Sequence, residues 1–265
     1  MPLGGHISNI CMTKKLIIGN WKMNPASLAE AKIVSTKIRQ TAALTKLVET
    51  VICPPAVFIT ACQPKNPVDN FNMGAQSLSI EEQGPFTGQI SASMLKSLGV
   101  KYVITGHSEE RAGGETDTMV SRKIKNALNA GIIPVVCVGE KNRDSENGSH
   151  YEYIKQQMKQ TLAEVPAKSA KDIVLVYEPV WAIGAKEAMD PAQIHEMALF
   201  VKKIFADTFG TDLVKKIKVL YGGSVNFRNA TDIIQTGQVD GLLVGRESVN
   251  VAGFTELLKV VDEIV

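Results

Sequence analysis

Short apolar segments recur along the whole sequence, and they constrain the fold more than any other feature. Each is rich in β-branched or other apolar residues and lacks the alternation of polar and apolar positions. Because a strand buried on both faces has no polar side, such segments are typical of a parallel sheet. Eight of them are present, at Leu16–Ile18, Thr50–Cys53, Asn72–Ala75, Tyr102–Thr105, Ile133–Val138, Ile173–Tyr177, Val219–Tyr221 and Leu242–Val244.

Segments with helical periodicity lie between these strands. Asp190 followed by Pro191 indicates a helix start, and Ala130-Gly131 indicates a helix end. Strands that alternate with helices over about 250 residues predict an α/β chain with the (β/α)8 barrel fold, with a doubly wound open sheet as the alternative. The expected helices are Leu28–Leu44, Asp117–Asn129, Tyr151–Leu162, Pro191–Phe209 and Ala252–Val261.

The chain has 265 residues, which suits one large domain or two small ones. No linker rich in Ser, Gly or Pro divides it, so we expect a single barrel domain over residues 14–265. The first residues, MPLGGHISNICM, lack the cationic start and apolar core of a signal peptide. We expect residues 1–13 to be a disordered extension, with Met12 as a second candidate for the natural start.

Charge and cysteine content exclude several function classes. The net charge is +2, and no polybasic block and no apolar stretch of about 20 residues is present. We therefore expect no nucleic-acid partner, no membrane partner and a cytoplasmic location. The cysteines, with no C-x-x-C spacing, predict reduced and mostly buried thiols and no metal site; they are Cys11, Cys53, Cys62 and Cys137.

Polar or otherwise unusual residues follow most of the predicted strands. The carboxyl ends of barrel strands converge on one face, where chemistry is found in this fold. A functional site is therefore expected there, formed from the residues at the strand ends: Asn20, Lys22, Gln76, His107, Glu109, Cys137, Glu178, Gly222, Gly223, Ser224 and Gly245.

Six motifs from Lys15 to the C-terminus resemble, in order and spacing, those of the triosephosphate isomerase family. They are GNWKMN (19–24), GHSE (106–109), PVVCVGE (134–140), YEPVWAIG (177–184), YGGSV (221–225) and DGLLVG (240–245). The family consists of (β/α)8 barrels, usually homodimers. They interconvert dihydroxyacetone phosphate and glyceraldehyde 3-phosphate, in glycolysis and gluconeogenesis, without a cofactor. The resemblance implies this isomerase activity (EC 5.3.1.1) for the chain.

Isomerisation moves a proton between two neighbouring carbons, so the site needs a base and an electrophile for the enediolate oxygens. Glu178 matches the base, and an apolar setting beside Pro179 and Trp181 would raise its proton affinity. His107 matches the electrophile. It precedes Ser108, an expected N-cap, and a helix N-terminus keeps the imidazole neutral, as is established for this family's own histidine.

Lys22 resembles the family's substrate-binding lysine, whose fixed charge favours the phosphate and the developing enediolate. The resemblance makes Asn20 a further polar contact to the substrate. Glu109 resembles the acid that stands next to the lysine and the histidine, where it orients groups or shuttles protons.

Phosphate binding is expected at the glycine-rich loops. A Gly-Gly pair after a strand is by itself only a turn signal, but barrels place backbone N–H groups around phosphate at their seventh and eighth strands. The residues expected to bind substrate in this way are Gly184, Ser224, Gly245 and Arg246. Arg246 stands where many relatives have glycine, but it keeps the backbone N–H.

The segment that begins at Gln76 and contains Thr87 resembles the loop through which family members contact a second subunit. We therefore expect a homodimer. This sequence departs from the family here, because Glu110 replaces a common arginine that pairs with the acid at Glu115. Two carboxylates cannot form that ion pair, so another arrangement must exist.

A second departure follows Gly184, where Ala185-Lys186-Glu187 replaces the usual Thr-Gly-Lys and removes a glycine from the lid over the active site. Two other functions are weighed: an isomerase of another small phosphosugar, and a non-catalytic barrel that binds a phosphorylated ligand. A binder has no need of Lys22, His107 and Glu178, and other phosphosugar barrels have no reason to combine them. Isomerisation of triose phosphate is the preferred prediction.

Overall fold

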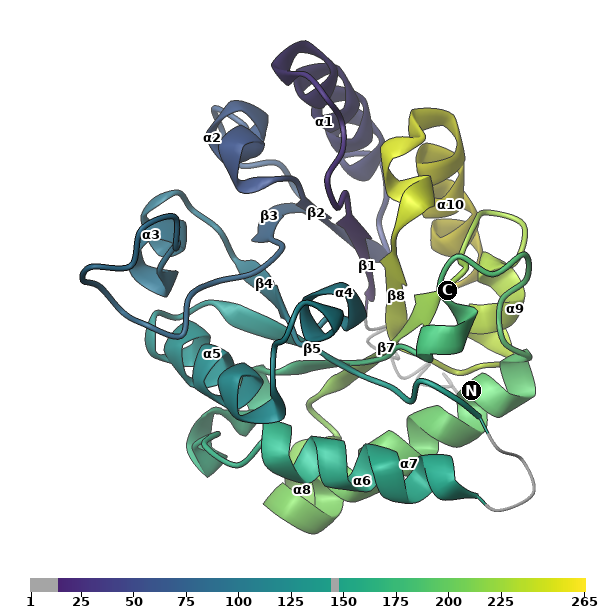
Figure 1. Cartoon of the computed structure of the whole chain (residues 1–265). Coiled ribbons are helices and arrows are strands. Elements are labelled where there is room, and N and C mark those ends of the chain that lie inside the picture. The colour runs from purple at the N-terminus through teal and green to yellow at the C-terminus, as the bar shows by residue number, and fades with distance from the viewer. Residues whose placement is uncertain (1–13, 144–147) are drawn as a thin grey trace, which may run out of the picture.

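The computed structural model describes residues 14–143 and 148–265, which form a closed barrel of eight parallel strands (Figure 1). Each strand pairs with its neighbours in sequence, and β1 also pairs with β8, from Leu16 opposite Gly241 to Gly19 opposite Val244. The predicted barrel and all eight predicted strands are confirmed, and the open sheet is wrong. The strands are β1 (Lys15–Asn20), β2 (Val48–Cys53), β3 (Phe71–Ala75), β4 (Tyr102–Thr105), β5 (Ile133–Val138), β6 (Val174–Tyr177), β7 (Lys218–Gly223) and β8 (Gly241–Val244).

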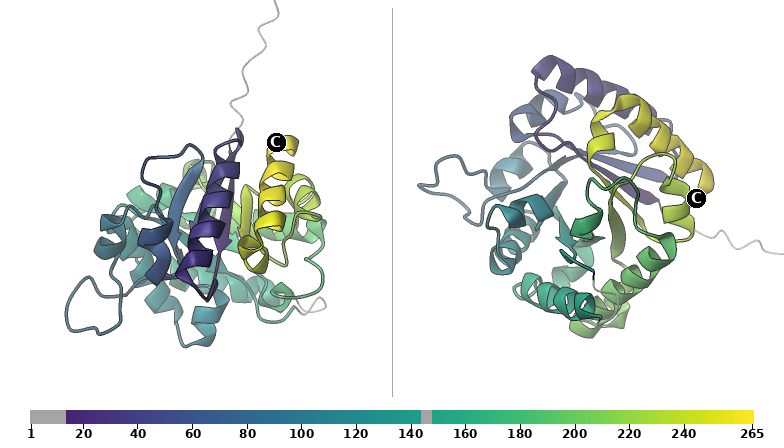
Figure 2. Two further views of the ribbon diagram at one scale, coloured as in Figure 1. Left: turned by 90° about the horizontal axis from the view of Figure 1, so that it is seen from above. Right: turned by 45° about the vertical axis from the view of Figure 1, so that its right-hand side comes forward.

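Helices lie outside the strands in every view (Figures 1 and 2). The five predicted helices are all present. The sequence reasoning missed the shorter helices, which have too few turns to show a period of 3.6 residues. The helices are α1 (Leu28–Ala42), α2 (Ile59–Cys62), α3 (Ala92–Ser97), α4 (Ser108–Ala112), α5 (Asp117–Asn129), α6 (Ser149–Thr161), α7 (Pro191–Phe209), α8 (Thr211–Val214), α9 (Ala230–Gln235) and α10 (Val251–Ile264).

Local hydrogen bonds explain where the long helices begin. The Asp190 carboxylate accepts the backbone N–H groups of Ala192 and Gln193, and Pro191 occupies the first helical position, as predicted. At α5 the hydroxyl of Thr116 accepts from the Met119 N–H. These caps satisfy N–H groups that have no partner within the helix.

The strands bury side chains on both faces. One set fills the barrel interior and the other packs under the helices, which is why the strands lack polar alternation. The interior cluster is Leu16, Ile18, Val51, Cys53, Tyr102, Ile104, Val135, Cys137, Val174, Val176, Leu220 and Leu243. Cys53, Cys62 and Cys137 are free and buried, as predicted, whereas Cys11 lies outside the described residues.

Three further expectations concern residues 1–13, membrane spans and metal sites. The extension expected at residues 1–13 lies outside the described part. Within residues 14–143 and 148–265, no helix is both long and apolar enough to cross a membrane, and no group of three or more His, Cys, Asp or Glu residues could hold a metal ion.

The connection between β3 and α3 projects away from the barrel in both views of Figure 2. It begins with Gln76, at the same end of the barrel as the other strand-end residues. The projecting part carries Phe86 and Thr87, both exposed.

Candidate active site

Glu178 directly follows β6 and is buried, with 5% of its surface exposed. Its backbone N–H donates to the Val138 carbonyl, 2.8 Å away, and this bond fixes it against the end of β5. A Cβ at Gly139 would lie 1.9 Å from the Glu178 carbonyl oxygen, so only glycine allows this approach. The Glu178 carboxylate accepts from His107 Nε2 at 3.1 Å and from the Ser108 N–H at 3.2 Å.

His107 follows β4 and is itself the N-cap of α4, which corrects the expectation that Ser108 would cap this helix. Its Nδ1 accepts the backbone N–H of Glu109 at 3.2 Å and so takes the role of a capping side-chain oxygen. Since Nδ1 accepts a hydrogen bond, the network assigns the ring proton to Nε2, which donates it to Glu178.

The sequence predicts a His107 imidazole kept neutral by the helix N-terminus. The electrostatics differ from this prediction as long as the Glu178 carboxylate is hydrogen-bonded to the ring. Burial lowers the pKa of the imidazole, but the hydrogen bond and negative charge of Glu178 raise it by more. The net result is a pKa above the ordinary histidine value, so the short α4 N-terminus does not by itself set the protonation state. A neutral ring is favoured once the carboxylate moves away, because burial and the charge of Lys22 then remain.

Lys22 lies just beyond β1 and contacts other predicted site residues at the same end of the barrel. Its Nζ is 2.5 Å from Glu109 Oε1, and its backbone N–H donates to Asn20 Oδ1 at 3.0 Å. A Cβ at Gly245 would lie 3.4 Å from Lys22 Cε, so the lysine stem runs past this glycine. Glu109 Oε2 is in turn 3.9 Å from His107 Nδ1. The predicted base, histidine, lysine and acid therefore form one continuous chain of contacts.

A cavity of about 600 Å³ opens beside Lys22, whereas Glu178, His107 and Glu109 are not among the residues that line it. Lys22 and the residues predicted to bind phosphate, Gly184, Ser224, Gly245 and Arg246, all line it. Lys186 lines it as well, a residue that the sequence reasoning noted only as a departure. Neither Lys186 nor Arg246 forms an ion pair with any described residue. The cavity therefore has a positive wall suited to an anion.

The segment after Glu178 is held at both ends by buried groups. At its beginning, Trp181 Nε1 donates to Glu140 Oε1 at 2.9 Å, and the hydroxyl of Tyr177 donates to the same carboxylate. At its end, the Met189 N–H donates to the Tyr221 hydroxyl at 3.1 Å. The sequence reasoning did not single out Glu140 or Tyr221, although both lie within the quoted motifs.

Ser224 makes a contact that was not expected. Its hydroxyl donates to the carbonyls of Ala182, at 3.0 Å, and Ala185, at 2.7 Å. The loop after β7 is thereby tied to the segment that covers the cavity, and only the backbone N–H of Ser224 is left to bind an anion.

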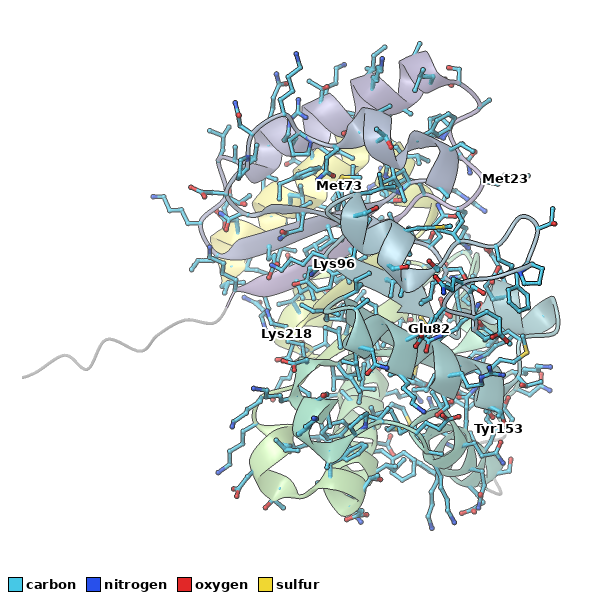
Figure 3. All side chains as sticks on the ribbon, turned by 90° about the vertical axis from the view of Figure 1, so that its left-hand side faces the viewer. Met23, Met73, Glu82, Lys96, Tyr153 and Lys218 are labelled. Atoms are coloured by element: carbon cyan, nitrogen blue, oxygen red, sulfur yellow. The ribbon has the colours of Figure 1, made fainter. Side chains whose placement is uncertain are left out.

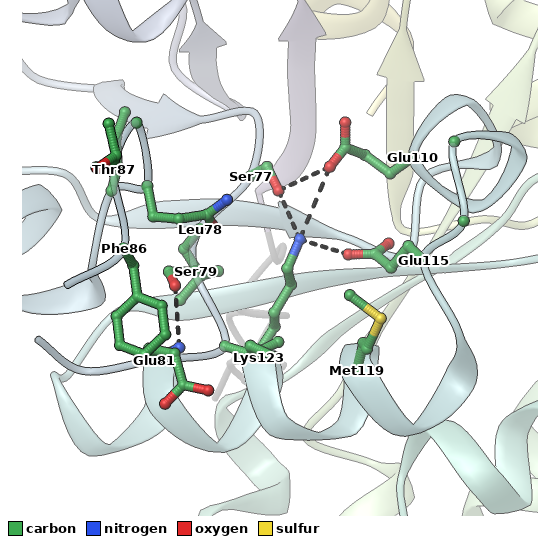
Figure 4. A pocket seen from close by; sticks show the side chains of 16 residues that line it. Ser77, Leu78, Ser79, Glu81, Phe86, Thr87, Glu110, Glu115, Met119 and Lys123 are labelled. Atoms are coloured by element: carbon green, nitrogen blue, oxygen red, sulfur yellow. Dashed lines mark hydrogen bonds and ion pairs between the residues drawn. The ribbon is translucent and has the colours of Figure 1, made fainter. Parts of the chain in front are cut away.

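The departure at Glu110 is compensated by Lys123, a residue of α5 that the sequence reasoning did not consider (Figure 4). The Lys123 ammonium is 2.5 Å from Glu115 Oε1 and 3.7 Å from Glu110 Oε2, and it donates to the Ser77 hydroxyl at 2.9 Å. Ser77 in turn donates to Glu110. One buried lysine thus pairs closely with Glu115 and more distantly with Glu110. The cluster lies beside a second cavity of about 660 Å³, which the projecting segment also lines.

The two residues assigned to the dimer loop lie apart. Thr87 is exposed on the projecting segment and lines the second cavity. Gln76 lies at the end of β3, where its Nε2 donates to the carbonyls of Lys22 and Cys53.

Comparison with known proteins identifies the family that this arrangement resembles. The family model for triosephosphate isomerase matches residues 15–261. The triosephosphate isomerase of Endomicrobium trichonymphae is 39% identical over 94% of this chain and 99% of its own. That of Carboxydothermus hydrogenoformans is 37% identical over 94% of this chain and 99% of its own. The solved triosephosphate isomerase from Bartonella henselae has a TM-score of 0.82 and 32% identity, and the match covers 93% of this chain and 98% of that one.

The Lys123 cluster predicts a large and specific loss of stability. Replacing Lys123 by Met leaves the Glu115 carboxylate, with 4% of its side chain exposed, buried without its cation. We expect the free energy of unfolding to fall by about 3–5 kcal/mol, measured by urea denaturation. The matched control is Lys125→Met, which breaks an exposed pair with Glu164 and should change stability by less than about 1 kcal/mol.

A further variant separates charge from packing. Adding Glu115→Leu to Lys123→Met should restore most of the lost stability, because no buried charge then remains unpaired. Equal losses for the Lys123 and Lys125 variants would contradict the assignment of Lys123 as the balancing charge.

Proposed function

The chain belongs to the triosephosphate isomerase family and interconverts dihydroxyacetone phosphate and D-glyceraldehyde 3-phosphate, and we propose that Glu178, His107 and Lys22 carry this reaction. The observation that supports these roles best is the contact between the Glu178 carboxylate and His107 Nε2, at 3.1 Å, beside a cavity lined by Lys22. A base, a hydrogen-bond donor and a fixed positive charge thus meet within reach of one small ligand.

Glu178 acts as the base in this proposal. Its carboxylate leaves His107 and the Ser108 N–H, and takes the proton from the carbon next to the substrate carbonyl. The electron pair of the broken C–H bond forms the C=C bond of the enediolate, and the proton of the substrate hydroxyl passes to the former carbonyl oxygen. The Glu178 carboxylic acid then returns its proton to the neighbouring carbon, where a C–H bond forms as the C=C electrons are used and the new carbonyl appears. Burial of Glu178 keeps bulk water away from the carboxylate during this exchange.

His107 and Lys22 stabilise the enediolate. The Nε2–H of His107, released by Glu178, donates to the two oxygens between which the double bond moves. Lys22 supplies positive charge to the same oxygens and to the phosphate, and Glu109 Oε1, at 2.5 Å, holds its ammonium group in place. Asn20 supports the lysine through its backbone N–H and offers a further polar contact to substrate.

The phosphate occupies the positive wall of the 600 Å³ cavity in this proposal. Gly184, Ser224 and Gly245 line that wall, and in this proposal their backbone N–H groups donate to the phosphate oxygens. Arg246 adds a full charge where relatives have glycine. Because Arg246 has no ion-pair partner among the described residues, its positive charge remains available to a phosphate dianion.

The segment from Trp181 to Met189 covers the phosphate as a lid. A covered enediolate is shielded from water and from loss of phosphate. The anchors at Glu140 and Tyr221 confine motion to the middle of the segment, where Gly184 has a φ of +69° and provides the flexibility that Ala185 and Lys186 lack.

Substitution of the base tests the catalytic assignment. Glu178→Gln keeps the shape of the side chain but cannot take up a proton, so turnover should fall about 10³-fold or more, equivalent to about 4 kcal/mol. The measurement is a coupled assay for glyceraldehyde 3-phosphate formation. Glu256→Gln, on the exposed face of α10, is the matched control and should retain full activity. Near-normal turnover in Glu178→Gln would remove Glu178 from the mechanism.

We also propose that the protein is a cytoplasmic homodimer that assembles through the projecting segment. Met23 supports this proposal, because 93% of its surface is exposed at a loop tip, where an apolar side chain gains from being covered (Figure 3). The 660 Å³ cavity offers apolar lining from Leu78, Phe86 and Ile90. In a two-fold dimer, Met23 of each copy can enter the cavity of the other. The buried free cysteines agree with a reducing compartment.

A charge at the exposed methionine tests the dimer. Met23→Asp should shift the protein towards monomer in sedimentation at micromolar concentration, because it would place a carboxylate against apolar side chains and near the Glu110 and Glu115 carboxylates that line the cavity. The matched control is Leu44→Asp, at a residue with 80% exposure on the opposite end of the barrel, which should sediment as the wild type does. A wild-type protein that is fully active as a monomer would contradict the proposal.

A further inference from the structure

Lys22 adopts an unusual backbone conformation, with a φ of +52°. Residues other than glycine rarely occupy this left-handed region, because their Cβ crowds the backbone. Such conformations persist where the surrounding structure imposes them, and they concentrate at functional sites. Some contact must therefore hold the Lys22 backbone in place.

Both peptide groups of Lys22 are bound by side chains. The Lys22 N–H donates to Asn20 Oδ1 at 3.0 Å, and the Lys22 carbonyl accepts from Gln76 Nε2 at 2.8 Å. Asn20 is the last residue of β1, so its bond ties the Lys22 N–H to the strand that the chain has just left. Gln76 lies 54 positions later, just after β3, and is the contact that ties the Lys22 carbonyl to a second part of the barrel.

Gln76 uses both hydrogens of one nitrogen. The same Nε2 donates to the carbonyl of Cys53, the last residue of β2, at 2.9 Å. The Trp21 N–H also reaches this carbonyl, at 3.2 Å. The carboxamide therefore joins the ends of three neighbouring strands, β1, β2 and β3, and fixes the height at which the chain leaves β1.

We propose that Gln76 is a positioning residue for the isomerase reaction, which holds Lys22 in its left-handed conformation and so fixes the ammonium group between Glu109 and Gly245. The inference rests on the proposed role of Lys22. Gln76 gives both hydrogens of its Nε2 to the main-chain carbonyls of Lys22 and Cys53, so it acts through Lys22 and not on the substrate.

The chemistry of the contact requires glutamine. Two carbonyl oxygens face one atom, so that atom must carry two hydrogens, which a carboxylate cannot supply. Asparagine has the same amide group on a side chain that is one methylene shorter. Gln76→Glu is therefore the sharpest substitution, because it keeps the size of the side chain and sets a negative oxygen against two carbonyl oxygens.

The first experiment compares kcat/KM of Gln76→Glu and Gln76→Ala with that of the wild type. We expect a fall of about 10- to 100-fold for each, the effect of two lost hydrogen bonds and a displaced charge. Gln40→Ala, at an exposed residue of α1 without contact to Lys22, is the matched control. Thermal melting and sedimentation confirm that each variant is folded and has the oligomeric state of the wild type.

The second experiment is a double-mutant cycle with Lys22→Ala, assayed at high enzyme concentration. If Gln76 acts through Lys22, the Gln76→Glu change should lower kcat/KM less than about 3-fold further in the Lys22→Ala background. A fall by the same factor in both backgrounds means a structural role and overturns the inference, as does normal activity of Gln76→Glu. An inactive wild type, or a fully active Lys22→Ala, would instead contradict the proposed function.

Discussion

The hydrogen bond between His107 Nε2 and Glu178 Oε1 joins the ends of β4 and β6, two strands that are not neighbours in the barrel. It forms because Gly139, which directly follows β5 between them, has no side chain and so lets the Glu178 backbone pass close to the end of that strand. The same contact determines the electrostatics of the site, since Glu178 is what raises the pKa of His107 against its burial. Glu178 and His107, the proposed base and electrophile, thus each satisfy a hydrogen-bonding group of the other.

The charges of the site follow from the closed barrel as well. Because parallel strands end on one face, Lys22 from β1 meets Glu109 from the end of β4 and the cavity wall formed after β7 and β8. Where this sequence departs from its family, neighbouring residues compensate. Lys123 replaces the missing arginine as the cation for Glu115, and its ammonium also lies 3.7 Å from Glu110 Oε2. The lid lacks a glycine, but Ser224 and Tyr221 fix the segment on either side of the change.

The sequence was sufficient to predict the barrel, its eight strands and its five long helices, because periodicity and capping residues such as Asp190 are local signals. It was also sufficient to place four site residues at the same end of the barrel, because the carboxyl ends of parallel strands lie on one face. These residues are Glu178, His107, Lys22 and Glu109. The sequence could not indicate contacts between residues far apart along the chain. The partnership of Lys123 with Glu115, the Ser224 bonds to the lid and the Gln76 bond to Lys22 all depend on how loops fold back. The cap of α4 was assigned to Ser108 by residue preference, whereas the imidazole of His107 takes that place.

An NMR titration of the His107 imidazole tests directly whether Glu178 controls its protonation. In the wild type the pKa of His107 should lie above the ordinary value of about 6.5, because the carboxylate offsets the effect of burial. In Glu178→Gln the neutral amide removes the charge and leaves the burial, so the pKa should fall below the wild-type value. The same His107 pKa in both proteins would contradict the account.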